Sequence, residues 1–155
     1  MTVRALALAA LALPLSSVLA AADPLVTIER PWARASIGTS LPAAAYATIR
    51  NDGDVPLALT GIVADVSEAA SVHESAVDAA GIAQMRPVGM LEVPAGGSVT
   101  LEPGGYHVML TELTRPLVEG ESFAATFLFS DGMEIEVEVP VSGIGARGPQ
   151  EPLEE

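Results

Sequence analysis

Four side chains of this 155-residue sequence carry donor atoms that suit a soft metal ion: His73, Met85, His107 and Met109. The chain holds two histidines, five methionines and no cysteine. Imidazole nitrogen and thioether sulfur form a soft, neutral donor set, which suits Cu(I). Zinc sites seldom use a thioether, and hard cations prefer oxygen ligands. The residue types therefore favour Cu(I) over other ions.

Strand periodicity predicts where these side chains point, because alternate residues of a strand share a face. In the segment 106–110, the apolar set should face the core: Tyr106, Val108 and Leu110. His107 and Met109 should then face outward or toward a loop. Val72 should point inward and leave His73 on the other face, and Met85 falls in a predicted loop or strand entry. Spacing alone also fits ordinary surface histidines and core methionines.

The elements around these residues are predicted to be short strands. No long segment has helical periodicity, whereas two-residue alternation recurs between turns rich in Gly, Pro, Asn and Asp. The clearest case is 133–141, where apolar residues alternate with glutamates after an Asp131–Gly132 turn. Further strands are expected within Leu25–Arg30, Ala43–Arg50, Leu57–Val63, Leu91–Val93, Ser98–Leu101 and Phe123–Phe129. Seven to nine strands predict an all-β fold, an antiparallel β-sandwich of immunoglobulin-like or cupredoxin-like type.

Several other residues receive structural interpretations. Pro94–Gly97 has the composition of a hairpin loop. Trp32, Met90 and Met133 are expected to pack in the core, and Arg34 is expected to hydrogen-bond across strands.

Charge and composition exclude several classes of function. Twenty acidic residues against seven basic ones, all arginine, give a formal net charge of −13. Nucleic acid and anionic lipid both require basic patches, so neither is an expected partner. The absence of cysteine excludes disulfides, thiolate metal sites, cysteine nucleophiles and lipid attachment through cysteine.

The two ends of the chain are predicted to lie outside the folded domain. Residues 1–22 are typical of a secretory signal peptide, with a basic Arg4, an apolar run and cleavage after Ala20 or Ala22. That run is about half the ~20 residues of a spanning helix, so no stable membrane anchor is expected. We expect a domain over 23–143, exported to a bacterial periplasm, and a disordered acidic tail over 144–155.

The spacing of the four donor residues is also specific. Eleven residues, one plus ten, lie between His73 and Met85. Twenty-one residues lie between Met85 and His107, and one residue lies between His107 and Met109. This pattern resembles the periplasmic copper chaperone family PCu(A)C, whose motif is H(M)X10MX21HXM. The resemblance covers about residues 25–142 and includes Pro31–Arg34, Ala43–Gly53, Val93–Gly96, Pro103–Leu110 and Pro116–Gly120.

The resemblance implies a cupredoxin-like β-sandwich with one Cu(I) at an exposed site, bound by His73, Met85, His107 and Met109. It also implies delivery toward the Cu(A) centre of cytochrome c oxidase, often alongside a Sco-type protein. One departure is Glu74, which stands where the family has an optional methionine; alternation should turn it away from His73. The segment 148–155 has no histidine or methionine, so one ion is expected.

Three functions are consistent with these residues. The first is a Cu(I) metallochaperone, the second a periplasmic copper buffer or resistance protein using the same site, and the third a secreted interaction module without metal. An enzyme is not expected, and no catalytic or organic-cofactor residue is predicted. The sequence has no G-x-S-x-G motif, and two histidines cannot build a three-histidine catalytic site.

Overall fold

The computed structural model describes residues 25–150, which form ten strands and no helix within that range. None of the described residues forms a helix long and apolar enough to cross a membrane. The strands are β1 (Val26–Arg34), β2 (Ala43–Asn51), β3 (Leu57–Ala64), β4 (Ser67–Val77), β5 (Ala83–Val88), β6 (Leu91–Val93), β7 (Gly97–Leu101), β8 (Tyr106–Leu113), β9 (Ser122–Phe129) and β10 (Glu134–Ser142). The predicted signal peptide lies outside the described residues.

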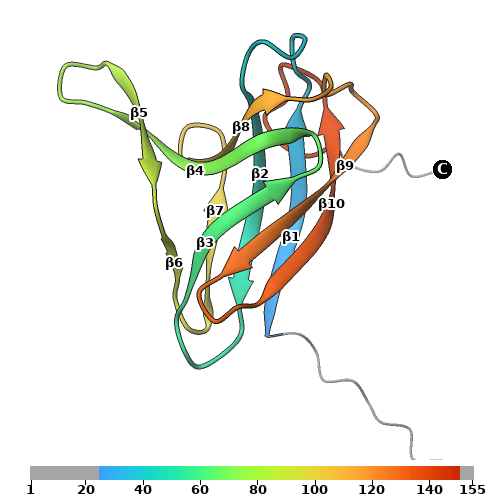
Figure 1. The fold of residues 1–155 in the computed structure, drawn as a ribbon. Coiled ribbons are helices and arrows are strands. Elements are labelled where there is room, and N and C mark those ends of the chain that lie inside the picture. Colours follow the sequence, from blue (N-terminus) through green and yellow to red (C-terminus); the bar gives the residue numbers. More distant parts are fainter. Residues whose placement is uncertain (1–24, 151–155) are drawn as a thin grey trace, which may run out of the picture.

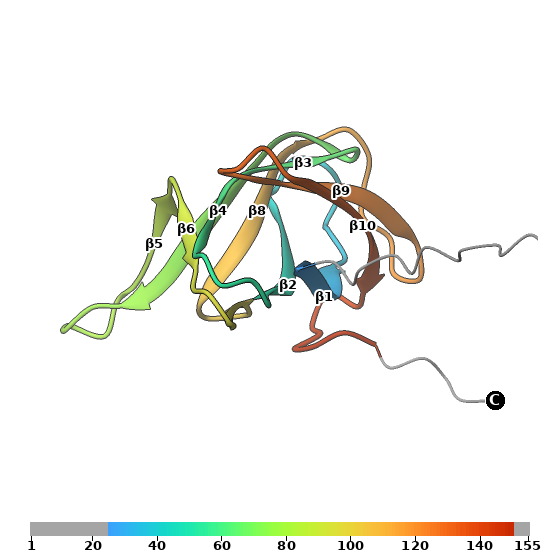
Figure 2. The same ribbon diagram turned by 90° about the horizontal axis from the view of Figure 1, so that it is seen from below.

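The strands follow the order β5-β4-β8-β7-β2-β1-β10-β9-β3-β6 and curve into a sandwich (Figures 1 and 2). One sheet of the sandwich runs from β5 to β1 in this order, and the other runs from β10 to β6. Strand β1 joins them, pairing antiparallel with β2 and parallel with β10 through Ala33 and Val141. The all-β sandwich is confirmed. Most strand pairs are antiparallel, as expected, and the β1–β10 and β7–β8 pairs are parallel.

Alternation places the core between the two sheets. On β9 and β10, apolar residues face each other across the ladder, as in Val139 opposite Phe123 and Ile135 opposite Phe127. The three phenylalanines of β9 are buried, and the intervening glutamates of β10 are exposed. Gly132, at a φ of 88°, closes the predicted turn, where the Phe129 carbonyl accepts its N–H.

Two expectations of the sequence fail where the chain passes between sheets. Pro94–Gly97 is a turn but not a hairpin, because β6 pairs with β3 and β7 pairs with β2. The Gly97 N–H donates to the Pro94 carbonyl at 3.1 Å, and Gly96 has a φ of 64°. Met90 lies just before β6 and is 69% exposed, so it does not pack in the core.

A second packed layer lies on the outer face of β1 and β2. The Trp32 and Tyr46 rings are both about 4% exposed, and their centres lie 4.5 Å apart. The Arg34 guanidinium lies 5.7 Å from the Tyr46 ring centre, and its Nε donates to the Ala146 carbonyl at 2.7 Å. Arg34 therefore bonds to the segment after β10 rather than across strands.

This segment, residues 145–150, is called the C-terminal strap below. It belongs to the stretch predicted to be a disordered tail, yet it is held by Arg34 and by Gln150, which donates to Glu119 at 2.9 Å. The remaining tail residues, 151–155, lie outside the described structure.

Truncating the centre of the core tests the packing. Ile49 of β2 is fully buried, so Ile49→Ala removes buried methyl and methylene groups and leaves a cavity. We expect it to lower the free energy of unfolding by about 2–5 kcal/mol, measured by urea denaturation. Val63→Ala, at a 57% exposed strand position, is the control. An equal loss in both variants would contradict the assigned core.

Candidate metal centre

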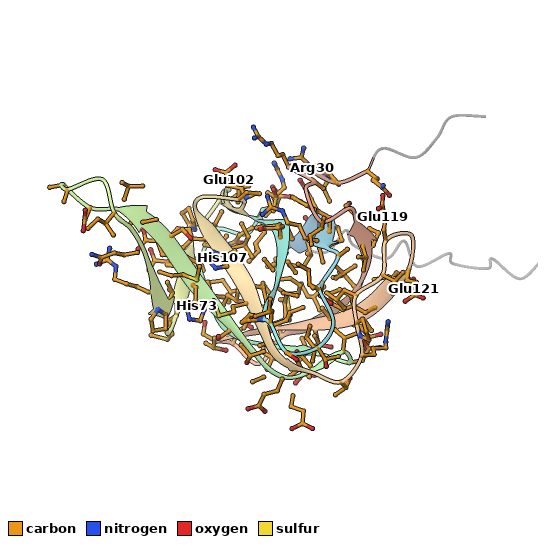
Figure 3. The ribbon with its side chains drawn as sticks, turned by 90° about the horizontal axis from the view of Figure 1, so that it is seen from above. Arg30, His73, Glu102, His107, Glu119 and Glu121 are labelled. Carbon is orange, nitrogen blue, oxygen red and sulfur yellow. The ribbon has the colours of Figure 1, made fainter. Side chains whose placement is uncertain are left out.

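Three strands at one edge of the sheet, β5, β4 and β8, carry all four predicted donor residues (Figure 1). His73 of β4 lies directly opposite His107 of β8, as the labelled side chains in Figure 3 show. Ser71 lies opposite Met109, and Ser75 lies opposite Met85 of β5. Directly opposed residues point to the same side of a sheet, and so do residues two apart. The register therefore brings all four donors to one face.

The reverse face of the same strands packs on the core. Val72 lies opposite both Val108 and Val88. Val72 is 6% exposed and Val108 is 3% exposed. The expected inward direction of Val72 and Val108 is confirmed. Met85 lies within β5 rather than in a loop, which places its thioether beside β4 at a fixed register position.

Exposure rises across the face from β8 to β5. His107 is 6% exposed, His73 and Met109 are half-buried, and Met85 is 53% exposed. His107 points away from the core and toward the turn before β8, in agreement with the predicted outward or loop-facing direction, but it is buried there. Two groups cover the His107 ring: the His73 ring, whose centre lies 6.0 Å from the His107 ring centre, and the turn before β8. The face therefore has a closed end at His107 and an open end at Met85.

A backbone carbonyl orients the His107 ring. Its Nδ1 lies 3.2 Å from the Gly105 oxygen, which can only accept a hydrogen bond. In this contact Nδ1 carries the proton, so the neutral ring presents a free lone pair at Nε2. Metal-bound histidines commonly use such a bond to fix tautomer and ring direction. The same carbonyl accepts the Ser75 N–H at 3.0 Å, which anchors it to β4.

The His73 ring has a different partner. The Ser71 hydroxyl lies 3.4 Å from its Nδ1, and a hydroxyl can donate or accept. Ser71 is also the residue opposite Met109, so one hydroxyl lies between two of the predicted donors. The contact directs Nδ1 toward Ser71 and leaves Nε2 for another ligand.

The two rings are close enough to share one ion. Metal–imidazole bonds are about 2 Å long, so a bridging ion needs nitrogens within about 4 Å of each other. The rings are nearly parallel, at 26°, and belong to directly opposed residues. Among the described residues, no group of three His, Cys, Asp or Glu side chains could hold a metal. An ion here would depend on thioethers as well as imidazoles.

Glu74 points away from this face. It lies opposite Tyr106 and Arg86 on the reverse side of β4, and its carboxylate lies 3.8 Å from the Arg86 guanidinium. The replacement of the family's optional methionine therefore removes a thioether without adding a carboxylate beside His73.

An aspartate that the sequence interpretation missed organises the hairpin carrying Met85. Asp78, in the β4–β5 loop, accepts the N–H groups of Ile82 and Ala80, each at 2.9 Å, and the Gln84 amide. The bond from Ile82 is the main cause that lowers the pKa of Asp78. Asp-Ala-Ala-Gly, with Gly81 at a φ of 80°, is a turn signal that points to this loop.

Comparison with known sequences supports a family assignment. Residues 26–141 match the family LpqE-like, described as "Putative lipoprotein LpqE-like". The chain is 29% identical over 116 residues to "Putative lipoprotein Lxx21020" of Leifsonia xyli subsp. xyli, covering 75% of this chain and 69% of that protein. It is 30% identical over 125 residues to "Uncharacterized protein RP573" of Rickettsia prowazekii, covering 78% and 68%.

Solved structures with the same fold include copper-related domains. The apo PCuAC domain from PmoF1 superposes with a TM-score of 0.64 at 28% identity, covering 77% of this chain and 95% of that one. Apo-DR1885 from Deinococcus radiodurans gives 0.59 at 31% identity, covering 92% and 95%. The Cu(I) form of DR1885 gives 0.56 at 31% identity, covering 74% and 78%.

The hydrogen bond to Gly105 predicts one tautomer for His107. In the metal-free protein, neutral His107 should carry its proton on Nδ1, because the carbonyl offers only an acceptor. Long-range ¹H–¹⁵N NMR of the ring checks this. His73 is the internal comparison, since Ser71 imposes no single tautomer. A protonated Nε2 on neutral His107 would contradict the assigned contact.

Proposed function

Because the chain belongs to the LpqE-like family and to the PCu(A)C copper chaperones, we propose that it binds one Cu(I) ion through His73, Met85, His107 and Met109 and passes it to an acceptor protein. Copper is the cargo in this proposal, and no chemical reaction of the protein is required. The chain's two histidines are both in the cluster, which leaves none for a separate histidine-based site.

The observation that carries the proposal is the shared face of the four donors. The β4–β8 register aligns the two imidazoles, and the β4–β5 register sets Met85 opposite Ser75, two residues from His73 on the same face. Two nitrogens and two sulfurs form a neutral set that stabilises Cu(I) and binds hard cations poorly. The bound site would keep a single positive charge, which an acidic protein of charge −13 accommodates in solution.

The exposure gradient supports release by ligand exchange. Met85 lies at the open end on β5, an edge strand paired on one side only. An acceptor ligand can approach the ion from this side, displace the Met85 thioether first and form an intermediate that shares ligands. His107 at the closed end would be displaced last. Thioethers bind less tightly than thiolates and need no proton to leave, which suits transfer.

The destination follows from the family resemblance. We propose the periplasm as the location, with the Cu(A) domain of cytochrome c oxidase, a Sco-type protein, or both as acceptors. The predicted signal peptide and the absence of cysteine fit a Cu(I) carrier in an oxidising compartment, where thioethers cannot be lost to disulfides.

Competition against a chromogenic Cu(I) chelator tests the site. We expect one tightly bound Cu(I) per chain, and a loss of affinity in His107→Ala larger than the 10–100-fold typical of outer-shell changes. Met85→Ala should weaken binding about tenfold, because it removes one exposed thioether. Met90→Ala is the matched control: the same residue type, 69% exposed, outside the cluster.

Two outcomes would overturn the site. The first is unchanged Cu(I) retention in His107→Ala. The second is an equal loss in Met85→Ala and Met90→Ala. Either result, with circular dichroism showing intact folding, would place Cu(I) binding outside these four residues, and failure of the unmodified protein to retain Cu(I) would favour an interaction module without metal.

Transfer kinetics separate a chaperone from a buffer. Loaded protein mixed with an apo Cu(A) domain or an apo Sco-type protein should transfer copper faster than the chelator complex does at the same free Cu(I). The physical reason is direct ligand exchange within a protein–protein complex. Transfer that depends only on free Cu(I), with no gain from this protein, would indicate buffering.

A further inference from the structure

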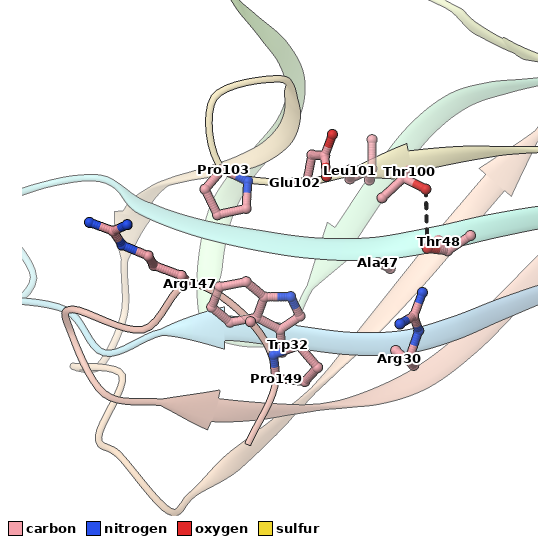
Figure 4. A pocket seen from close by; sticks show the side chains of 11 residues that line it. Arg30, Trp32, Ala47, Thr48, Thr100, Leu101, Glu102, Pro103, Arg147 and Pro149 are labelled. Atoms are coloured by element: carbon pink, nitrogen blue, oxygen red, sulfur yellow. Dashed lines mark hydrogen bonds between the residues drawn. The ribbon is translucent and has the colours of Figure 1, made fainter. Parts of the chain in front are cut away.

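A cavity separate from the donor cluster lies on the outer face of β1, β2 and β7, beneath the C-terminal strap (Figure 4). Its volume is about 200 Å³, and none of the four predicted copper ligands lines it. This volume is below the range of drug-sized sites, so it suits a small molecule. Its lining is divided between apolar and polar groups, which makes an amphiphilic ligand the natural occupant.

The floor of the cavity presents unused hydrogen-bond donors. Trp32 is 4% exposed, and no hydrogen bond within residues 25–150 uses its indole N–H. Among the described residues, Ser67 Oγ is the only buried side-chain nitrogen or oxygen without a hydrogen-bond partner, so the Trp32 N–H is not fully buried. It therefore opens toward the cavity that the Trp32 ring lines (Figure 4). Beside it, the Thr48 and Thr100 hydroxyls lie 3.4 Å apart, and Thr48 is 9% exposed.

Two arginines flank this floor, Arg30 and Arg147. The described residues include six arginines, and the other four are engaged: Arg34 with Ala146, Arg50 with Asp52, Arg86 with Glu74 and Arg115 with Glu121. Arg30 and Arg147 make neither an ion pair nor a hydrogen bond within residues 25–150. Both arginines that lack a partner within residues 25–150 therefore line one cavity.

The local backbone explains how Arg30 reaches this position. The β1–β2 register shifts between Glu29 and Trp32, and Arg30 has a φ of 47° within that bulge. Bulges re-aim side chains and occur often beside functional sites. A non-glycine residue in the left-handed region is strained, and the bulge places it at the cavity rim.

We propose that this cavity binds a small organic anion, with a carboxylate or phosphate head held by Arg30, Arg147 and the Trp32 N–H. Guanidinium groups match the planar, bidentate geometry of such heads. The apolar body would lie against the Trp32 ring and the rings of Pro103 and Pro149, which line the cavity. Glu102, the only acidic residue in the lining, repels a second negative charge and so favours a head of low charge. The proposal does not depend on copper binding.

The single tryptophan makes the test site-specific, because Trp32 is the chain's only indole. The metal-free full chain is titrated at constant ionic strength with benzoate, phenyl phosphate and neutral benzyl alcohol, and tryptophan emission and calorimetry are recorded. We expect saturable binding of benzoate or phenyl phosphate and none of benzyl alcohol. The stronger of the two anions identifies the preferred head group.

A charge-matched pair of variants supplies the control. Arg30→Gln with Arg147→Gln should weaken anion binding about tenfold or more, because it removes the charged donors. Arg50→Gln with Arg115→Gln removes the same charge from ion-paired positions outside the cavity and should leave affinity unchanged. Three results would overturn the proposal: no saturable response, equal binding of benzyl alcohol and benzoate, or equal losses in the two double variants.

Discussion

The alignment of β4 with β8 is the constraint on which the donor cluster depends. It sets His73 opposite His107 on one face and Val72 opposite Val108 on the other. A slip of one residue would exchange the two faces, burying an imidazole in the apolar core and exposing a valine. The hydrophobic effect on the core side therefore fixes the spacing of the polar side. The sandwich supplies geometry to the cluster without contributing a single core residue to it.

The other half of the cluster is held much less firmly. β5 is exposed along most of its length and lies at the sheet edge, so the position of Met85 relies on the β4–β5 ladder and on the Asp78 loop. Segments with few buried contacts open most readily. A carrier needs this asymmetry: a rigid end preserves the site between binding events, and a loose end lets an incoming ligand compete. A cluster closed on every side would hold its ion but exchange it slowly.

The sequence predicts the residues on the core-facing side of the strands better than the contacts on their outer side. Alternation gave the strands and the inward residues, such as Val72 and Val108, because burial on the core side imposes a strict two-residue period. It also gave the direction of His107, away from the core and toward a loop, but not its burial, which arises from a ring on another strand and from the turn before β8. The sequence also did not show that Pro94–Gly97 crosses between the two sheets. The residues of a turn indicate that the chain reverses, but they do not indicate which strands pair on either side of it. The family resemblance implied that the four donors act together, and the β4–β8 and β4–β5 registers place them on one face.

The outer face is one continuous surface from the donor cluster to the anion cavity. Ala44 of β2 lies opposite Met109, and two residues further along the same face Tyr46 lies opposite Trp32. A methyl group therefore lies beside Met109, and the tilted Trp32 and Tyr46 rings lie beyond it. Arg34 contacts the Tyr46 ring and the strap over the cavity, so a ligand that moves the strap would act on the layer next to the proposed copper ligands. The turn between β7 and β8 gives the shortest connection between the two sites: Glu102 lines the cavity and accepts the Gly105 N–H, and the Gly105 carbonyl contacts the His107 ring.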